Sequence, residues 1–402
     1  MRAAVLALVL VLGACSSPSG PQADSSSQPT ATAISPPPAT SGSSTTPSAT
    51  AAPIHITPPS AGLLFAVVEN PVGSGCCGGE PTGVSAGTVA IVDINGHIKA
   101  TATFLPRRLP AIGNSAVILQ APALVAASGI YYLDGTGTVR VLRVNSSPQV
   151  VATFLQQGQP YETWFAISPT GSSIVAGVLT FDAAGSYFSL YTAPSGGSPT
   201  QTVHAEAAGP PNQMVNLPFP VGWISAGPVA MNPGSITTQN AWVGGPLQVL
   251  TFAPGGVQGT AIGGADCRSA SITPSGLIPC ISSKGVVSVR DTTSKINWTT
   301  QVAGFNAVSL FLSPDGQAIS DGQQASSDGG VTWYMVVETH ARGAIQMPKG
   351  FRIEGWLDSN TVIGAVTPPG SGDEGNLSWV SLDDPSTVHD LGFKGDFVAP
   401  LS

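Results

Sequence analysis

Charged side chains are scarce in this chain of 402 residues. Lys and Arg number 14, Asp and Glu number 22, and together they make up only 9% of the sequence. Binding to a phosphate backbone needs a clustered basic face, whereas the formal net charge here is −8. We therefore expect no nucleic-acid partner. The five histidines are scattered singly, without the spacing of metal ligands, so we expect neither a metal nor a cofactor.

Stretches suited to long helices are missing as well. The chain contains 48 Gly and 36 Pro, and both residue types are too unfavourable inside helices for a helical bundle at this density. From residue 61 onward, turn residues recur about every 8–12 positions and apolar residues alternate with polar ones, which is typical of many short strands. With 42% apolar residues the chain can still build a large core. The sequence predicts an all-β protein.

No uninterrupted apolar run reaches the length of about 18 residues that a membrane span needs. The apolar stretch Ala3–Leu12 follows Met1 and Arg2 and is typical of a short secretory signal. It ends in Leu-Gly-Ala-Cys15, which resembles a bacterial lipobox. The resemblance implies a lipoprotein signal peptide over residues 1–14 and a lipid on Cys15; a plain signal peptide with an incidental Cys is the alternative. We expect an exported protein, held by this lipid at the outer face of a bacterial membrane.

The segment after Cys15 differs in composition from the rest of the chain. Residues 16–60 consist almost entirely of Ser, Thr, Pro and Ala, and Asp24 is their only acid. Such a segment cannot bury enough apolar surface to offset the entropy lost on ordering. We therefore predict that residues 15–60 are a lipidated Cys followed by a disordered tether, and that residues 61–402 are folded.

A repeat runs through residues 61–402. Each copy contains a Gly-led strand, and most copies are preceded by two strands around a tight turn such as SPTG, TPSG or SPDG. The leading glycines are 40 to 60 residues apart: Gly87, Gly137, Gly185, Gly245, Gly285, Gly330 and Gly375. Repeats of this length in an all-β chain indicate propeller blades, each a four-stranded sheet. Seven copies predict a seven-bladed β-propeller, with six or eight blades as the alternatives.

The first repeat lacks one strand. It contains a strand near residues 63–70 and the strands from Gly87, but only tether sequence precedes residue 63. The apolar segment Gly395–Pro400 belongs to no other blade. We therefore predict that this C-terminal segment supplies the innermost strand of the first blade, which would remove the exposed edges of an open ring.

The order of strand, SPDG-like turn, strand and Gly-led strand ending in Asp-x-x-Gly resembles the TolB/WD40-like propeller repeats of exported bacterial proteins. The likeness covers residues 61–402 at the level of architecture, and the Trp-Asp pattern of the WD40 family proper is absent. It implies that ligands bind at the central channel and on the face that carries the connections between blades. The expected binding loops join second to third strands, at residues 69–86, 231–244, 320–329 and 367–374.

One motif within the repeats is similar to the Asp-box of sialidase-like and other BNR-repeat propellers. The motif S-x-D-x-G-x-T-W is matched by Ser326, Asp328, Gly330, Thr332 and Trp333. The resemblance implies a structural role, in which the Asp bonds across a hairpin turn and the Trp packs between blades. Alignment of the copies places this motif between second and third strands, whereas the family places it between third and fourth.

The Asp-box raises a sialidase-like glycoside hydrolase as the alternative function. The resemblance would then imply three Arg around the substrate carboxylate, a Tyr/Glu pair and an Asp acid. The Phe-Arg-Ile-Pro motif that should precede the Asp-box is absent, and Phe351-Arg352-Ile353-Glu354 follows it without the Pro. We therefore expect no catalytic residues.

The chain has five cysteines, and four remain once Cys15 is assigned to the lipid. Cys267 and Cys280 flank a TPSG turn at positions that are nearly opposite on antiparallel strands, so we predict a disulfide between them. Cys76 and Cys77 are adjacent in a Gly-rich insertion and form either a vicinal disulfide or bonds elsewhere. A vicinal disulfide at this place would resemble that of PQQ-dependent alcohol dehydrogenases. The eight blades and the Trp docking motif of that family are absent from this sequence.

Aromatic and polar residues between strands are the candidates for a recognition surface, with packing between blades as the alternative. They are Tyr161, Glu162, Trp164, Phe219 and Trp242. The hypothesis from the sequence is a cell-surface, lipid-anchored and monomeric propeller that binds a protein, cell-wall or glycan partner without catalysis. The rival hypothesis is the extracellular hydrolase.

Overall fold

The structure is a computed structural model. It describes residues 59, 62–69, 87–105, 123–154, 161–181, 186–207, 219–232, 248–252, 259–269, 271–282, 284–302, 310–327, 330–367 and 375–401. Residues 1–53 form one unit and residues 54–402 a second, and all the described residues belong to the second. The predicted signal peptide, Cys15 and the predicted tether, apart from residue 59, lie outside the described residues.

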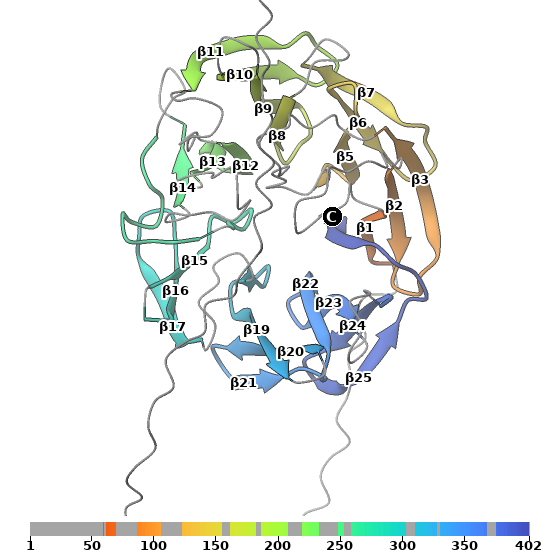
Figure 1. The fold of residues 1–402 in the computed structure, drawn as a ribbon, viewed down its shortest axis with the longest axis vertical. Coiled ribbons are helices and arrows are strands. Elements are labelled where there is room, and N and C mark those ends of the chain that lie inside the picture. The colour runs from red at the N-terminus through yellow and green to blue at the C-terminus, as the bar shows by residue number, and fades with distance from the viewer. Residues whose placement is uncertain are drawn as a thin grey trace, which may run out of the picture. The chain divides into compact units, whose positions relative to one another are not determined.

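Antiparallel strands make up the regular structure of the described residues, which contain no helix. The strands pair in seven small sheets, called blades 1 to 7. The blades stand in a ring, with the first strand of each nearest the middle (Figure 1). No helix able to cross a membrane occurs in the part of the chain that the structure describes. The predicted all-β, seven-bladed propeller is confirmed, and the six- and eight-bladed alternatives are wrong.

Five blades have four strands, in order from the innermost to the outermost. Blade 1 contains β26 (Asp396–Leu401), β1 (Leu64–Glu69), β2 (Gly87–Asp93) and β3 (Ile98–Phe104). Blade 2 contains β4 (Ala123–Ala126), β5 (Gly129–Leu133), β6 (Thr138–Leu142) and β7 (Gln149–Thr153). Blade 3 contains β8 (Tyr161–Ile167), β9 (Ser173–Phe181), β10 (Ser186–Pro194) and β11 (Thr200–Ala207). Blade 6 contains β18 (Phe311–Leu312), β19 (Ala318–Ser327), β20 (Gly330–Thr339) and β21 (Gly343–Gln346). Blade 7 contains β22 (Phe351–Asp358), β23 (Thr361–Val366), β24 (Leu377–Ser381) and β25 (Asp384–Asp390).

Among the described residues, blades 4 and 5 have three strands each, where the sequence predicted four. Blade 4 contains β12 (Phe219–Ile224), β13 (Gly227–Asn232) and β14 (Gln248–Thr251), and blade 5 contains β15 (Ile278–Ile281), β16 (Val286–Arg290) and β17 (Ile296–Gln301). Isolated bridges stand in for the fourth strand, from Leu250 to Ala261 outside β14 and from Arg268 to Ile281 inside β15. In blade 5, Pro279 has no N–H to give to a further strand.

The ring closes through the C-terminal strand, as predicted. β26 pairs antiparallel with β1, from Leu64 opposite Leu401 to Val68 opposite Asp396. β26 also contacts β22 of blade 7 and β4 of blade 2, so it links the last blade to the first two. This pairing covers the inner edge that β1 would otherwise expose.

The hydrophobic core is divided among neighbouring blades. One cluster combines Phe65 and Val92 of blade 1 with Leu357 and Trp379 of blade 7. Other clusters are shared in the same way by blades 1 and 2, 2 and 3, 4 and 5, 5 and 6, and 6 and 7. Because each cluster needs two sheets, a blade has no complete core without its neighbours.

Several tight turns share one hydrogen-bond pattern. In blade 1, Asp93 Oδ1 accepts the N–H groups of Asn95 and His97 at 2.9 and 3.0 Å, and the Asp93 carbonyl accepts the N–H of Gly96 at 3.0 Å. Gly96 has a φ of +80°, which favours glycine. The pattern recurs from Asp134, Ser282 and Asp291. Gly137 of blade 2 and Gly285 of blade 5, which the sequence placed at the start of a strand, are therefore the last residues of such turns.

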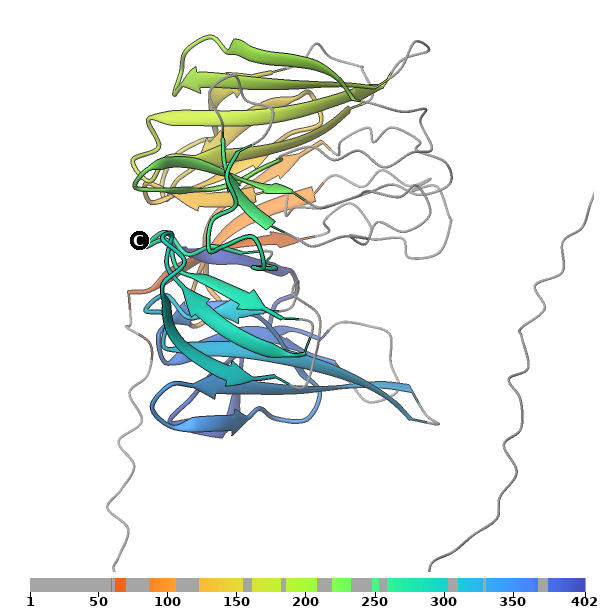
Figure 2. The same ribbon diagram turned by 90° about the vertical axis from the view of Figure 1, so that its left-hand side faces the viewer.

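Hairpins between second and third strands differ in length. β9 and β10 have nine residues each and β19 and β20 have ten, whereas β5 and β6 have five. The long hairpins of blades 3 and 6 extend to the same side of the ring (Figure 2). The loop expected at 320–329 is wrong over most of its length, because β19 continues to Ser327. The other three expected loops, apart from their first residues, lie outside the described residues.

We predict that Phe397→Ala destabilises the ring, because this side chain holds the closing strand. Its ring packs 6.1 Å from that of Phe65, and Gly355 of blade 7 leaves the room it occupies, since a Cβ there would lie 2.6 Å from the Phe397 ring. We expect a loss of about 2 kcal/mol in the free energy of unfolding, measured by urea denaturation. Ile296→Ala, at a side chain that is 52% exposed, serves as the control and should change it by less than about 0.5 kcal/mol. Equal effects of the two substitutions would contradict the role of Phe397.

Candidate functional site

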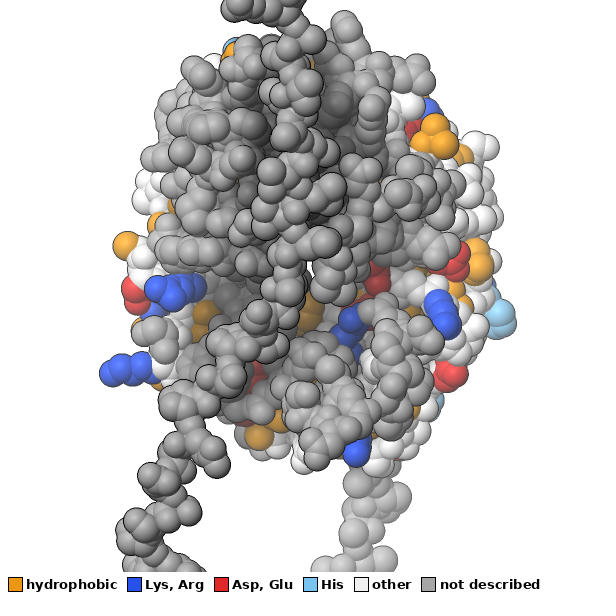
Figure 3. Space-filling view, in the orientation of Figure 1, with side chains coloured by type: hydrophobic (Ala, Val, Ile, Leu, Met, Phe, Trp, Pro, Cys, Tyr) orange, Lys and Arg blue, Asp and Glu red, His pale blue; other side chains and the backbone are white. Residues whose placement is uncertain are grey.

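In the described residues, second strands end and third strands begin on the same face of the ring, and we call this face the loop face. This follows from the antiparallel order within every blade, and the two long hairpins project from it (Figure 2). Acidic and basic side chains lie next to one another near the middle of this face (Figure 3). Because the inner strands also begin here, the loop face and the adjoining ends of the inner strands form one candidate site.

A charged cluster lies where blade 7 meets the closing strand. In β22, Phe351 and Ile353 are buried, and Arg352 and Glu354 alternate with them toward the other side of the strand. The Arg352 Nη2 donates to Glu354 Oε1 at 3.0 Å, and the Phe397 N–H donates to Glu354 Oε2 at 2.9 Å. Glu354 therefore joins an inner strand of blade 7 to the backbone of β26.

Burial governs the titration of this carboxyl group. The Glu354 side chain is only 11% exposed, and burial raises its pKa from 4.5 to about 7. The Phe397 N–H and the Arg352 guanidinium oppose the rise, whereas the negative charge of Asp396 adds to it. The group therefore changes charge near neutral pH. Both of its oxygens are engaged by protein groups, so the arrangement holds the closing strand in place.

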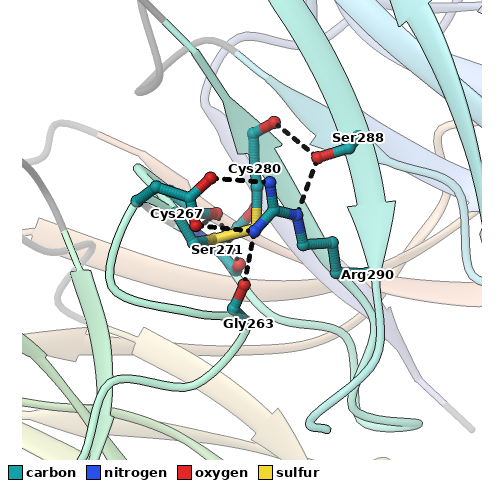
Figure 4. Close-up of a disulfide and its surroundings, with 8 residues drawn as sticks. Gly263, Cys267, Ser271, Cys280, Ser288 and Arg290 are labelled. Atoms are coloured by element: carbon teal, nitrogen blue, oxygen red, sulfur yellow. Dashed lines mark hydrogen bonds and ion pairs between the residues drawn. A yellow bond between two sulfur atoms is a disulfide. The ribbon is translucent and has the colours of Figure 1, made fainter. Parts of the chain in front are cut away.

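A second cluster surrounds the disulfide of blade 5. Cys267 and Cys280 are bonded to each other, and the two residues are 1% and 2% exposed. Arg290 of β16 reaches over the same place (Figure 4). Its Nη1 donates to the Gly263 carbonyl and to Asp266 Oδ1, both at 2.8 Å, and its Nη2 donates to Asp266 Oδ2 at 3.0 Å. The guanidinium holds the pKa of the Asp266 carboxyl below its usual range.

Two of the residues predicted to face a ligand lie in the interior. Trp164 of β8 is 1% exposed and Phe219 of β12 is not exposed at all. Their ring centroids are 3.7 Å apart, and the Phe188 ring meets Phe219 edge-on at 5.9 Å. Trp164 and Phe219 therefore pack between blades 3 and 4, which was the alternative to a role in the recognition surface. Tyr161 and Glu162 are the first residues of β8, at the loop face, but their side chains and all of Trp242 lie outside the described residues.

The Asp-box residues lie around the tip of the β19–β20 hairpin. Ser326 is near the end of β19, Gly330 begins β20, and Thr332 and Trp333 stand opposite Ala325 and Gln324. The motif thus lies between the second and third strands of blade 6, where the sequence placed it. Asp328 is outside the described residues, as are Cys76 and Cys77.

The cluster at Glu354 was not predicted as a site. The sequence drew attention to Phe351–Glu354 only as an incomplete sialidase motif. The signal that could have found it was the alternation of apolar and charged residues immediately before Gly355 and Trp356, which places a carboxylate inside a buried strand. Its partner Phe397 is 43 positions away, so only the closure of the ring brings the two together.

Neither the known protein families nor the curated proteins contain a match to this sequence. Among solved structures, it resembles the Dos1 propeller at 12% identity, over 83% of this chain and 86% of that one, with a TM-score of 0.43. It also resembles BamB from Moraxella catarrhalis (13% identity, 68% and 70% coverage, TM-score 0.31) and an oligogalacturonate lyase in complex with manganese (8% identity, 81% and 78% coverage, TM-score 0.32). These likenesses concern the fold alone.

We predict that the propeller loses stability as pH rises through neutrality. The folded state raises the pKa of Glu354 above its ordinary value, so between about pH 4.5 and pH 7 it binds a proton more tightly than the unfolded chain does. The stability that this proton provides is therefore greatest at acidic pH and falls as the carboxyl ionises. The expected change is at most about 3 kcal/mol, measured by urea denaturation between pH 5 and pH 8.5.

The matched variant is Glu354→Gln, which keeps the shape of the side chain but cannot ionise. Its stability should be flatter over this pH range than that of the wild type. Glu338→Gln is the control, at a carboxylate of β20 that accepts a hydrogen bond from Thr300, and it should keep the wild-type profile. An unchanged profile in Glu354→Gln would show that another group causes the pH dependence.

Proposed function

We propose that this protein is an exported lipoprotein that presents a non-catalytic β-propeller at the outer face of a bacterial membrane. The Leu-Gly-Ala-Cys15 sequence and the Ser/Thr/Pro/Ala-rich segment after it support the anchor. The propeller then acts as a binding or scaffold module for a protein, cell-wall or glycan partner. Structures of similar fold include the Dos1 propeller and BamB.

The observation that carries the binding proposal is the uneven loop face. Two hairpins, β9–β10 and β19–β20, are nearly twice as long as the β5–β6 hairpin and rise from a ring that closes on itself (Figure 2). Blades 3 and 6 are separated by two blades on one side of the ring and three on the other, so their hairpins stand almost opposite each other. Long elements on a rigid frame are where binding surfaces are commonly built, and this spacing suits a macromolecule.

The same face gives little support to the rival hydrolase. Among the described residues of the inner strands, Arg352, Glu354 and Asp396 form the charged cluster, with a single Arg where a sialidase-like site would use three. Both oxygens of Glu354 accept hydrogen bonds from within the protein. A general acid or base needs a free approach to its substrate, and the contacts of Glu354 leave its carboxylate in a structural role.

The anchor is tested by Cys15→Ser in the producing cells. We expect the wild type to incorporate a radiolabelled fatty acid and to sediment with membranes, since acyl chains hold it there. The variant should incorporate none and be recovered in the soluble fraction. Cys76→Ser is the control and should behave like the wild type. Membrane association that survives Cys15→Ser would disprove the lipid anchor.

The binding surface is tested by shortening the β19–β20 hairpin. Gly322 and Met335 are opposite each other, so residues 323–334 can be replaced by an Asn-Gly turn that keeps the strand pairing. With purified Cys15→Ser protein, we expect binding to isolated cell envelopes to weaken at least about tenfold, because a partner contact of about 1.4 kcal/mol or more is lost. The control inserts two residues after Gly197, in the turn between β10 and β11 on the opposite face, and should bind like the parent protein.

The outcomes of this experiment separate the two functions. Equal binding by all three proteins, or by none of them, would contradict recognition at the loop face. Release of sugars from the envelope by the parent protein, but not by a Glu354→Gln variant, would instead support the hydrolase.

A further inference from the structure

Residues 259–269, called the strap, cross from the outside of blade 4 to the inside of blade 5. At the blade 4 end, the Ile262 N–H donates to the Val249 carbonyl at 2.8 Å and the Thr251 N–H donates to the Thr260 carbonyl at 3.0 Å. At the blade 5 end, the described residues provide one backbone hydrogen bond between strap and sheet, from the Ile281 N–H to the Arg268 carbonyl at 2.9 Å. Apart from the packing of Ile262 and Cys267 in the core cluster of blades 4 and 5, the described backbone pairing of the strap with β15 is thus confined to one point.

Pro279 limits this attachment toward the start of β15. In an antiparallel strand, alternate residues direct their N–H groups to the same side. Ile281 points its N–H toward the strap, so the next donor on that side would belong to residue 279, which is a proline. Pro279 has no N–H and cannot donate such a hydrogen bond, and the described bridge between the strap and β15 is the pair Arg268 and Ile281.

Two side-chain links take over where the backbone pairing ends. The disulfide joins Cys267 of the strap to Cys280 of β15, immediately beside the single bridge. Arg290, which is anchored to Ser288 Oγ at 2.9 Å, holds Gly263 and Asp266 of the strap close to the disulfide (Figure 4). Gly263 lies over the sulfur atoms, since a Cβ there would be 3.1 Å from Cys267 Sγ and 3.2 Å from Cys280 Sγ.

We propose that the Cys267–Cys280 disulfide is a redox-controlled clasp, which fixes the strap to blade 5 when oxidised and releases it when reduced. In the reduced protein the strap separates from β15, and the inner edge of that strand, with the Ile281 N–H, faces the middle of the ring. The rest of the ring stays folded, because the core clusters of blades 6, 7, 1, 2 and 3 do not include the strap.

The chemistry is thiol–disulfide exchange with a dithiol reductant. One thiolate of the reductant attacks a cysteine sulfur, which breaks the S–S bond, forms a mixed disulfide and releases the other cysteine as a thiolate. The second thiol of the reductant then attacks the mixed disulfide and releases the remaining cysteine. Two electrons pass from the reductant to the cystine, and the products are two cysteine thiols and the oxidised, cyclic dithiol.

Burial determines how this exchange begins. With Cys267 and Cys280 only 1% and 2% exposed, the reductant reaches a sulfur atom only after the strap has opened locally. The Arg290–Asp266 ion pair opposes that opening. Weakening it should therefore speed up reduction of the disulfide without changing the disulfide itself.

The clasp is tested by hydrogen exchange in the Cys15→Ser, Cys76→Ser, Cys77→Ser protein, whose remaining cysteines are Cys267 and Cys280. The oxidised protein is compared with protein reduced by dithiothreitol and alkylated. We expect reduction to lower protection about 100-fold in residues 259–269 and in β15, as a cross-link closing a loop of this length would suggest, while β22–β25 stay protected. Because alkylation could disturb packing, Cys267→Ala, Cys280→Ala protein is measured as well and should match the reduced protein.

Asp266→Asn, which removes the charge that Arg290 binds, should be reduced at least about fivefold faster than the parent protein. Asp384→Asn is the control, at an exposed carboxylate of blade 7, and should be reduced at the parental rate. Unchanged protection of the strap after reduction would overturn the proposal. Loss of protection in all blades would also overturn it, because the disulfide would then stabilise the whole ring and not the strap.

Discussion

The structure depends on the pairing of β26 with β1. Each core cluster is shared by two neighbouring sheets, so no blade can bury its apolar face without the blade on either side. A ring of such sheets leaves no unpaired face only if the last blade meets the first. Here that contact is made by the core cluster shared by blades 7 and 1 and by the six residues of β26, which pair with β1. The closing strand therefore contributes to the cooperativity of the whole ring.

Closure of the ring separates the part of the chain that must be regular from the part that is free to vary. The inner strands and the shared cores fix the spacing of the blades, and the Asp- or Ser-led turns repeat one local solution. Hairpin length on the loop face is not constrained by these contacts, so blades 3 and 6 carry long hairpins while blade 2 has a four-residue turn from Asp134 to Gly137. A rigid frame with unequal hairpins is well suited to recognition.

The repeat, the blade number and the closing strand could be predicted from sequence because they depend on local patterns and on a count of strands. Trp164 and Phe219 were wrong as ligand contacts because an aromatic residue near the end of a strand can face either solvent or the next blade. Where the described parts of blades 4 and 5 have an isolated bridge in place of a fourth strand, the repeat pattern could not reveal it, since this pairing depends on contacts outside the repeat. Glu354 was missed because its partner belongs to the closing strand, whose register depends on the complete ring.

Glu354 also has a role in specifying the register of β26 against β1. β26 contains an irregularity at which Ala66 faces Ala399 and Val67 faces Phe397, leaving Val398 without an opposite residue. A strand that tolerates such a bulge could pair one residue out of step, which would turn Phe397 away from Gly355. In the observed register the Glu354 carboxylate accepts the Phe397 N–H. Burial raises the pKa of this carboxyl group, so its ionisation lowers the stability of the fold at neutral pH. A buried charge kept at such a cost is consistent with specifying one register, so the ring trades some stability for a single way of closing.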